Sequence, residues 1–426
     1  MYVTPSVEVS DPSTPLHLSE KPTAIMSAIV MSNAALVVSD EPVVGNPEST
    51  GPSNGFNFRH RMPALDGLRG LAILSVFLYH YAGGTDHHPD SVLLKGMYSI
   101  TRFGWAGVDL FFVLSGFLIT GILYDTRNDS GYLRKFYARR SLRIFPVYYL
   151  FLAIVVIVGA LVGVRWRFAQ TSFLLYVGYP CALVWPHLIP ATSYLRITHL
   201  WSLCMEEQFY LVWPLLIGAL GTPRRILCAC GFLMCVALTL RILVWGAGWL
   251  NPVWAYTFLP FRMDSLVLGA ALAVLLRGQH TTRLAKAAPI VLACSVAGLF
   301  AVCMAARTTE HDSPEIGTVG FTLIALASGS LLVLAVLKQG IVRKIFSANA
   351  LRTLGKYSYG LYLYHFPLAV LLDPAKPPLV HLLHSEVFGK MLFVMLSLAI
   401  NFGVAWSSFR FIESPIMNLK NRFKYA

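Results

Sequence analysis

Charged residues are scarce in this chain. They make up 13% of its 426 residues, whereas hydrophobic residues make up 56% and the mean hydropathy is +0.61. A soluble domain usually has about 25% charged residues. So little charge, together with long apolar runs, excludes an ordinary soluble protein and predicts a chain that crosses a membrane several times.

Cysteine is also rare, and its spacing does not suit a cross-linked or metal-bound protein. The chain has seven cysteines, an odd number, and most of them fall inside apolar segments. Cys228 and Cys230 are separated by a single residue, which is not the Cys-x-x-Cys spacing of zinc and redox sites. We therefore expect small buried side chains, no disulfide framework and no metal.

A continuous basic surface is missing as well, although the net charge is +13. The Lys and Arg residues occur in short loops between apolar runs, where the positive-inside rule places them. We therefore expect no binding of nucleic acid. No internal repeat of the inverted-transporter kind is visible.

The first 60 residues differ from the rest. They are rich in Pro, Ser, Thr and Gly, a composition that cannot bury a core and predicts disorder. No basic run precedes their mildly apolar stretch, so we expect no cleaved signal peptide, and Met26 and Met62 leave open a start further downstream. We expect a disordered extension at 1–60, a membrane domain at 61–416 and a basic cytoplasmic tail at 417–426.

Ten apolar runs from residue 65 onward are long enough to span a membrane. A further run, 172–185, is short and is interrupted by Gly178 and Pro180. If this run does not span, 22 Lys and Arg residues face one side of the membrane and 7 face the other, a strong positive-inside bias. We therefore predict an all-α polytopic bundle of about ten transmembrane helices, with both termini cytoplasmic and 172–185 re-entrant or interfacial. The predicted spans are 65–82, 105–124, 144–163, 199–219, 226–246, 254–276, 287–306, 316–337, 355–373 and 389–412.

The first run, LDGLRGLAILSVFLYHY, contains Asp66, Arg69 and His80. An Arg or Asp near the centre of a spanning helix costs roughly 2.5–3.5 kcal/mol, so such residues are candidates for function. His80 lies about 16 Å along the helix from Arg69, and a histidine there can act as a general base. Alternatively, Asp66 and Arg69 form only an interfacial ion pair.

A cationic loop precedes the third run and contains Arg139, Arg140 and Arg143. The positive-inside rule by itself explains most of its cations. However, Arg140 and Arg143 are one turn apart at the membrane entrance, and paired guanidinium groups bind phosphate well. These arginines are therefore candidates for binding a nucleotide-bearing donor.

The segment THLWSLCMEEQFYLVWP places His199, Ser202 and Glu206 on one helical face, with Glu207 on a neighbouring stripe. A Ser-His-carboxylate triad is one interpretation, but three residues stacked on one helix rarely reach that geometry. We interpret Ser202 as a hydrogen-bonding residue at the helix N-terminus. At least one of the adjacent glutamates should face a polar cavity or a buried cation.

Further ionisable residues in the apolar runs, of both signs, indicate a polar chamber inside the bundle. Arg262 and Asp264 could instead be a structural ion pair with each other. With Asp66, the members of this chamber are Asp109, Arg262, Asp264 and His365.

These segments together resemble the acyltransferase-3 family of integral membrane O-acyltransferases. The opening signature is an Arg, ten residues and a His, here Arg69 and His80 within LDGLRGLAI and the residues after it. The stretch GVDLFFVLSGFLIT follows at 107–120, and the Arg-x-x-Arg element is Arg140 to Arg143. The block HLWSLCMEEQFY occupies 199–210, and LGKYSYGLYLYHFP and FRFIESP match the late signatures, so that the resemblance covers about 63–415.

The resemblance implies transfer of an acyl group, often acetyl, from acyl-CoA to a hydroxyl group, with no bound cofactor. The acceptor is typically a polysaccharide of the cell envelope or an exported one, and sometimes a macrolide, a lipid or another small molecule. The chain resembles the stand-alone type, without an esterase-like domain, and a bacterial inner membrane is the expected location. A transporter of glycan or lipid is the main rival interpretation.

Specific roles follow from the same resemblance. Arg140 and Arg143, assisted by Arg139, would hold the phosphates of coenzyme A at the cytoplasmic face, and Arg69 would orient the thioester arm. His80 would act as general base or carry the acyl group. Glu206 or Glu207 would orient a histidine, and His199 or His365 would share the work.

Overall fold

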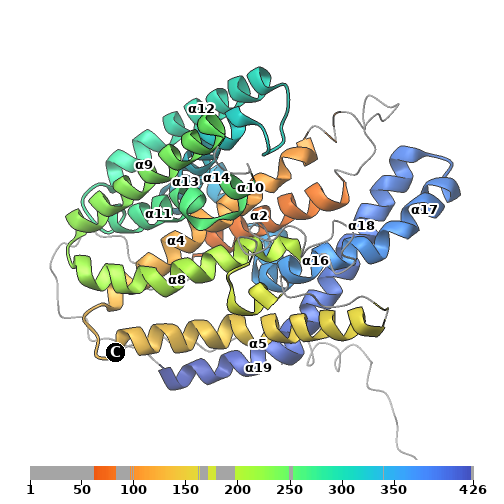
Figure 1. The fold of residues 1–426 in the computed structure, drawn as a ribbon, viewed down its shortest axis with the longest axis horizontal. Helices are drawn as coiled ribbons and strands as arrows, with labels where there is room; N and C mark the ends of the chain where they lie inside the picture. The colour runs from red at the N-terminus through yellow and green to blue at the C-terminus, as the bar shows by residue number, and fades with distance from the viewer. Residues whose placement is uncertain are drawn as a thin grey trace, which may run out of the picture. The chain divides into compact units, whose positions relative to one another are not determined.

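The computed structural model contains helices and no strand within the residues it describes (Figure 1). The chain divides into two units, 1–53 and 54–426, and every described residue belongs to the second. The predicted disordered extension at 1–60 lies outside the described residues. The described residues are 62–82, 96, 98, 100–161, 163, 171–178, 197–248, 253–338 and 340–423.

Long helices alternate with short helical segments along the described chain. Two of the short segments, η5 and η7, are π-helical, and the other η segments are 3₁₀ helices. The elements are α2 (Pro63–Tyr81), η1 (Arg102–Ala106), α4 (Gly107–Thr126), α5 (Tyr132–Leu161), η2 (Ser172–Leu175), η4 (Thr198–Leu200), α8 (Trp201–Leu220), α9 (Pro223–Ala247), α10 (Val253–Thr257), α11 (Leu259–Leu275), α12 (Thr281–Ala306), η5 (Ile316–Gly320), α13 (Phe321–Leu337), α14 (Ile341–Phe346), α15 (Asn349–Lys356), α16 (Ser358–Leu372), η6 (Asp373–Ala375), α17 (Lys376–Leu382), α18 (Glu386–Ser408), η7 (Phe409–Glu413), α19 (Ser414–Met417) and η8 (Asn418–Phe423).

Each of the ten predicted spans coincides with a helix, and the prediction of an all-α membrane bundle is confirmed. Within the described ranges, eight helical segments are long and apolar enough to cross a membrane. The other two predicted spans are α2, which contains polar residues, and α16, whose 15 residues extend only about 22 Å. The count of ten and the cytoplasmic termini stay predictions.

The short run at 172–185 does not form a long helix in its described part. Residues Ser172–Leu175 make a 3₁₀ turn, after which Tyr176 and Gly178 take left-handed backbone conformations. The remainder of this run lies outside the described residues. The described part is compatible with the predicted re-entrant or interfacial segment.

Local sequence signals set the ends of several helices, and α9 shows them well. The Thr222 side chain accepts a hydrogen bond from the Arg225 amide, and Pro223 occupies the first helical position, where its missing N–H costs nothing. The helix ends at Gly248, which has a positive φ that glycine adopts readily. The boundaries of α9 are therefore encoded locally.

Glycines allow the helices that carry the site to approach one another closely. A Cβ atom on Gly116 of α4 would lie 1.8 Å from the Leu266 carbonyl oxygen, and one on Gly269 of α11 would lie 2.0 Å from the Val113 carbonyl oxygen. No side chain fits at these distances, so α4 and α11 are in direct backbone contact. The pair α2 and α15 meets in the same way at Gly70 and Gly355, and α2 meets the last residue of α14 at Gly67.

Large apolar side chains cover much of the outer surface of the bundle. On α12, for example, Ile290, Phe300 and Met304 are all more than 60% exposed. In Figure 1, α9, α11, α12 and α13 lie side by side, and α12 packs mainly on α13. Such surfaces are stable in lipid and costly in water, so the chain is a polytopic membrane protein.

Candidate functional site

One cavity collects residues from five helices that are far apart in the sequence. It lies between α2, α4, α5, α8 and α16 and contains about 640 Å³ of space not filled by atoms. Its walls combine cationic, hydroxyl-bearing and apolar side chains. The lining residues are Arg69, Val108, Phe111, Phe112, Ser115, Arg140, Arg143, Ile144, Ser202, Leu203, Glu206, Tyr210, Ser358, Tyr359 and Tyr362.

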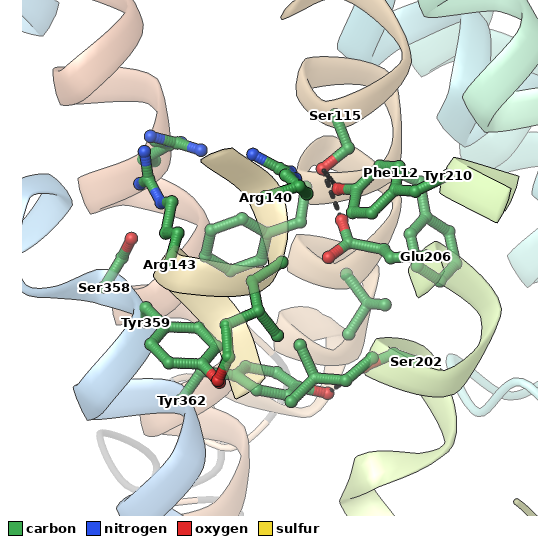
Figure 2. A pocket seen from close by; sticks show the side chains of 15 residues that line it. Phe112, Ser115, Arg140, Arg143, Ser202, Glu206, Tyr210, Ser358, Tyr359 and Tyr362 are labelled. Carbon is green, nitrogen blue, oxygen red and sulfur yellow. Dashed lines mark hydrogen bonds between the residues drawn. The ribbon is translucent and has the colours of Figure 1, made fainter. Parts of the chain in front are cut away.

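Three arginines make this cavity strongly positive. Arg69, Arg140 and Arg143 all line it, and Figure 2 shows the guanidinium groups of Arg140 and Arg143 at the same end. The Arg140 guanidinium lies over the Tyr210 ring, 4.3 Å from its centroid, and its buried Nε has no hydrogen-bond partner among the described residues. A buried cluster of guanidinium groups with spare donors is suited to an anion such as phosphate.

Glu206 is the one carboxylate among the residues that line the cavity. Its side chain accepts a short hydrogen bond from Ser115, and Ser115 in turn accepts one from Tyr210 at 2.9 Å. Figure 2 shows Ser115, Glu206 and Tyr210 together on one side of the cavity, next to Arg140, whose guanidinium lies over the Tyr210 ring. The cavity therefore contains three fixed cations and one fixed carboxylate.

The opposite end of the cavity is formed by Ser202 and Tyr362 (Figure 2). Their hydroxyl groups share a hydrogen bond of 2.5 Å, and the Tyr362 hydroxyl also lies 3.0 Å from the His199 carbonyl oxygen. Ser202 therefore bonds to a tyrosine and does not cap a helix amide, as its position had suggested. A Ser202–His199–Glu206 triad is not assembled, because Glu206 bonds to Ser115 instead.

Three histidine rings gather just beyond Tyr362. The His365 ring is close to those of His80 and His199, with centroid distances of 5.0 Å and 5.2 Å. The Tyr362 ring is 5.3 Å from His365 and 5.8 Å from His199, so the Tyr362 end of the cavity adjoins the histidines. We call His80, His199 and His365 the histidine cluster. These residues come from α2, η4 and α16.

A buried ion-pair network lies apart from the cavity lining. Arg262 pairs with Asp109 at 2.7 Å, and Asp264 pairs with Arg241 at 2.8 Å. The suggestion that Arg262 and Asp264 pair with each other is wrong, because side chains two residues apart on a helix do not face one another. Asp109, Arg262 and Asp264 therefore tie α4, α9 and α11 together.

The remaining candidates lie near the cavity without lining it. Glu207 interacts electrostatically with Arg140, and Asp66 does so with Arg69. Arg139 donates hydrogen bonds of 3.3 Å to the carbonyl oxygens of Lys420 and Phe423. Of the three arginines assigned to the donor, the structure brings two into the cavity and holds the third against the C-terminal segment.

A loop between α12 and η5 packs over the same end of α2 as His80. Glu310 accepts hydrogen bonds from Arg102 at 2.9 Å and from Tyr79 at 3.4 Å. The His311 ring stacks on Tyr256 with centroids 3.8 Å apart. Burial lowers the pKa of His311 to about 4, although Asp312 opposes the shift. His311 is therefore a neutral aromatic partner at neutral pH.

Several lining residues escaped the sequence reasoning, and Ser115 and Tyr362 are two examples. Ser115 sits in an apolar run, where a lone serine carries no signal of its own. Tyr362 is three residues before His365 on the same helix, and that spacing could have identified it.

Comparison with known proteins relates this chain to membrane acyltransferases. The sequence model of the family described as "Acyltransferase domain" matches residues 62–410. The peptidoglycan O-acetyltransferase OatA of Listeria monocytogenes is 29% identical over 391 residues, which cover 86% of this chain and 57% of that protein. The putative peptidoglycan O-acetyltransferase YrhL of Bacillus subtilis is also 29% identical, over 84% of this chain and 55% of its own length. The O-acetyltransferase OatA of Staphylococcus aureus is 28% identical, over 83% and 57%.

The chain thus spans little more than half the length of these curated relatives. No solved structure matches it significantly.

Proposed function

Because the chain belongs to the acyltransferase family whose sequence model covers residues 62–410, we propose that it transfers an acetyl group from acetyl-CoA to a hydroxyl group of a cell-wall polysaccharide. The observation that carries this proposal is the cavity, which has three arginines at one end and Tyr362 with the histidine cluster at the other. A donor with phosphates at one end and a thioester at the other matches this polarity.

The donor end of the reaction uses the arginines. Arg140 and Arg143 bind the phosphates of acyl-CoA, and Arg69 completes the cationic wall. The apolar residues between the two ends, such as Phe111 and Phe112, contact the less polar part of the donor. On the predicted topology this end faces the cytoplasm, because Arg140 and Arg143 follow a cationic loop.

The chemical step takes place near the histidine cluster. His80 removes the proton from the acceptor hydroxyl as its oxygen attacks the thioester carbonyl. A carbon–oxygen bond forms, the carbon–sulfur bond breaks, and His80 returns the proton to the departing thiolate of coenzyme A. About 16 Å along α2 separates Arg69 from His80, so an extended donor molecule is required to reach both.

The acceptor is proposed from the names of the relatives, which are peptidoglycan O-acetyltransferases. A cell-wall glycan is the acceptor favoured here, and a bacterial inner membrane is the corresponding location. A macrolide, a lipid or another small hydroxyl compound is the alternative acceptor. A transporter of glycan or lipid is the alternative activity, and it would not break the thioester.

The first test measures acyl transfer by purified protein in nanodiscs with radiolabelled acetyl-CoA. The assay follows release of the coenzyme A thiol and incorporation of label, with and without uncross-linked peptidoglycan strands. We expect thiol release by the wild type and at least a 100-fold loss in His80→Ala, since general acid–base groups contribute about 10²–10⁴-fold. His381→Ala, which removes an exposed histidine on α17, is the matched control. Equal rates in wild type and His80→Ala would remove His80 from the mechanism.

The donor assignment has its own test. We expect Arg140→Gln to raise the KM for acetyl-CoA by about 10–100-fold, because a hydrogen bond to a charged group is worth about 1.5–3 kcal/mol. Arg134→Gln removes an exposed arginine from the same helix and should change little. Equal KM values for the two variants would contradict the placement of the phosphates.

A further inference from the structure

His365 has a hydrogen-bonding arrangement that the proposed function leaves unexplained. Its side chain is fully buried, and its Nδ1–H donates to the Tyr362 carbonyl oxygen at 2.6 Å. A carbonyl only accepts, so this bond fixes the tautomer and leaves the lone pair on Nε2. That Nε2 has no hydrogen-bond partner among the described residues. Leaving a buried acceptor unsatisfied is costly.

The rings around His365 are those of the histidine cluster. The His365 ring is in contact with both the His80 and the His199 ring. Phe366 covers the cluster, with its ring centroid 4.7 Å from that of His80 and 5.4 Å from that of His199. His365 Nε2 therefore lacks a partner among the described residues in a cluster where the neighbouring His80 ring is only partly buried.

The backbone of His365 is tied to the helix that carries His80. The Tyr81 hydroxyl donates to the His365 carbonyl oxygen at 2.8 Å, and Asn401 donates to the Tyr81 hydroxyl at the same distance. Tyr81 is the residue after His80, so α16, α2 and α18 are joined at this point. The distance between His80 and His365 is therefore held fixed by bonds to the backbone.

We propose that His365 is a positioning residue for His80: its Nε2 accepts the second ring N–H of His80 when His80 takes the acceptor's proton. This inference rests on the proposed function. No proton moves to His365; it accepts a hydrogen bond while His80 is charged. When His80 passes its proton to the coenzyme A sulfur, that hydrogen bond weakens again. The arrangement gives the base an orienting partner, as general-base catalysis requires.

Variants of His365 separate this role from simple packing. His365→Phe keeps a ring and removes both nitrogens, and His365→Asn keeps a short polar group that does not reach the Nε2 position. His365→Gln is long enough to place an amide oxygen near that position. Phe366→Leu, which perturbs the same cluster without removing a polar atom, is the control.

Kinetics form the first arm of the test, with acetyl-CoA and peptidoglycan strands as substrates. We expect His365→Phe and His365→Asn to lower kcat by about 10–100-fold, the effect of losing a hydrogen bond to a charged group, with KM for both substrates unchanged. His365→Gln should recover to within about fivefold of the wild type. The inference would be overturned if His365→Phe and His365→Asn both kept the wild-type kcat. It would also be overturned if His365→Gln, although folded, lost as much kcat as the other two variants.

A second arm does not depend on acetyl transfer. The rate at which diethyl pyrocarbonate modifies His80 is measured by peptide mass spectrometry at pH 8 and at pH 5. The reagent attacks only an uncharged imidazole, and His365 stabilises the charged one, so the fall in rate from pH 8 to pH 5 should be smaller in His365→Phe and recover in His365→Gln. An equal fall in all variants would refute the role of His365. If the wild type transfers nothing, the proposed function fails and this arm alone decides the inference.

Discussion

The ion pair between Asp109 and Arg262 permits a quantitative prediction. Both side chains are completely buried, and their charged atoms are 2.7 Å apart. Asp109 also accepts a hydrogen bond of 2.8 Å from Ser265, whereas Arg262 Nε and Nη1 have no partner among the described residues. The Arg262 guanidinium lies 3.7 Å from the centroid of the Phe321 ring. Asp109 is thus its one close counter-charge in the described structure.

Replacing Asp109 by leucine removes that counter-charge. The arginine would then remain charged in an apolar, ring-lined site, and we expect the free energy of unfolding to fall by about 3–5 kcal/mol. In Asp109→Leu/Arg262→Met, both buried charges are gone and the volumes are similar. Because well-packed apolar residues often replace a buried pair without loss, the double variant should recover to within about 1 kcal/mol of the wild type.

The measurement is a double-mutant cycle on protein in mixed micelles, unfolded by titration with SDS and followed by tryptophan fluorescence. The coupling free energy between the two positions should be about 2–4 kcal/mol, from the difference between single and double variants. A double variant as unstable as Asp109→Leu would refute the reasoning. A loss below about 1 kcal/mol in the single variant would do so too, since it would place the pair in contact with water.

Three further predictions follow from features already described. Gly116→Leu should prevent folding, because the Cβ atom of the new leucine would lie 1.8 Å from the Leu266 carbonyl oxygen. The expected result is loss of the monodisperse peak in size-exclusion chromatography, and normal elution would contradict the close contact. His311 has a lowered pKa of about 4, so the stability it confers is fully present above pH 6.5 and decreases by at most about 3 kcal/mol as pH falls towards 4. The variant His311→Phe keeps the stack on Tyr256, and its thermal unfolding should lose this dependence on acid pH. An unchanged dependence would show that another group is responsible. Glu206→Gln should tighten the binding of coenzyme A about fivefold at low salt, as measured by calorimetry. The reason is that it removes the carboxylate that shares the cavity with three guanidinium groups. Weaker binding would mean that Glu206 positions a group of the donor.

The sequence alone was sufficient for the helices and singled out some of the residues that line the cavity. Apolar runs located all ten segments, because hydrocarbon solvent leaves little choice of secondary structure. Arg69, Arg140, Arg143 and Glu206 stood out as polar residues in such runs, and the family resemblance grouped them. Their convergence on one cavity depends on tertiary packing, which no spacing rule predicts.

The failures have specific physical causes. Arg139 and Arg140 are equivalent in a sequence, yet a helix turns about 100° per residue, so only Arg140 faces the cavity. Arg262 was paired with a neighbour in sequence, whereas its partner Asp109 is 153 residues away. His80 on α2 and His365 on α16 are likewise far apart in the sequence, although their rings are in contact.

The π-helical turn at Phe409–Glu413 constrains how this chain can change in length. A π turn holds one residue more than an α turn, so deleting a single residue there would let α18 run on as regular α-helix. Everything beyond would then keep its orientation, whereas deleting one residue from α18 itself would rotate everything beyond by about 100° about the axis. That segment supplies the carbonyl groups of Lys420 and Phe423 that accept hydrogen bonds from Arg139 of α5. A one-residue deletion in α18 would therefore alter the surroundings of the donor arginines, whereas the same deletion in the π turn would not.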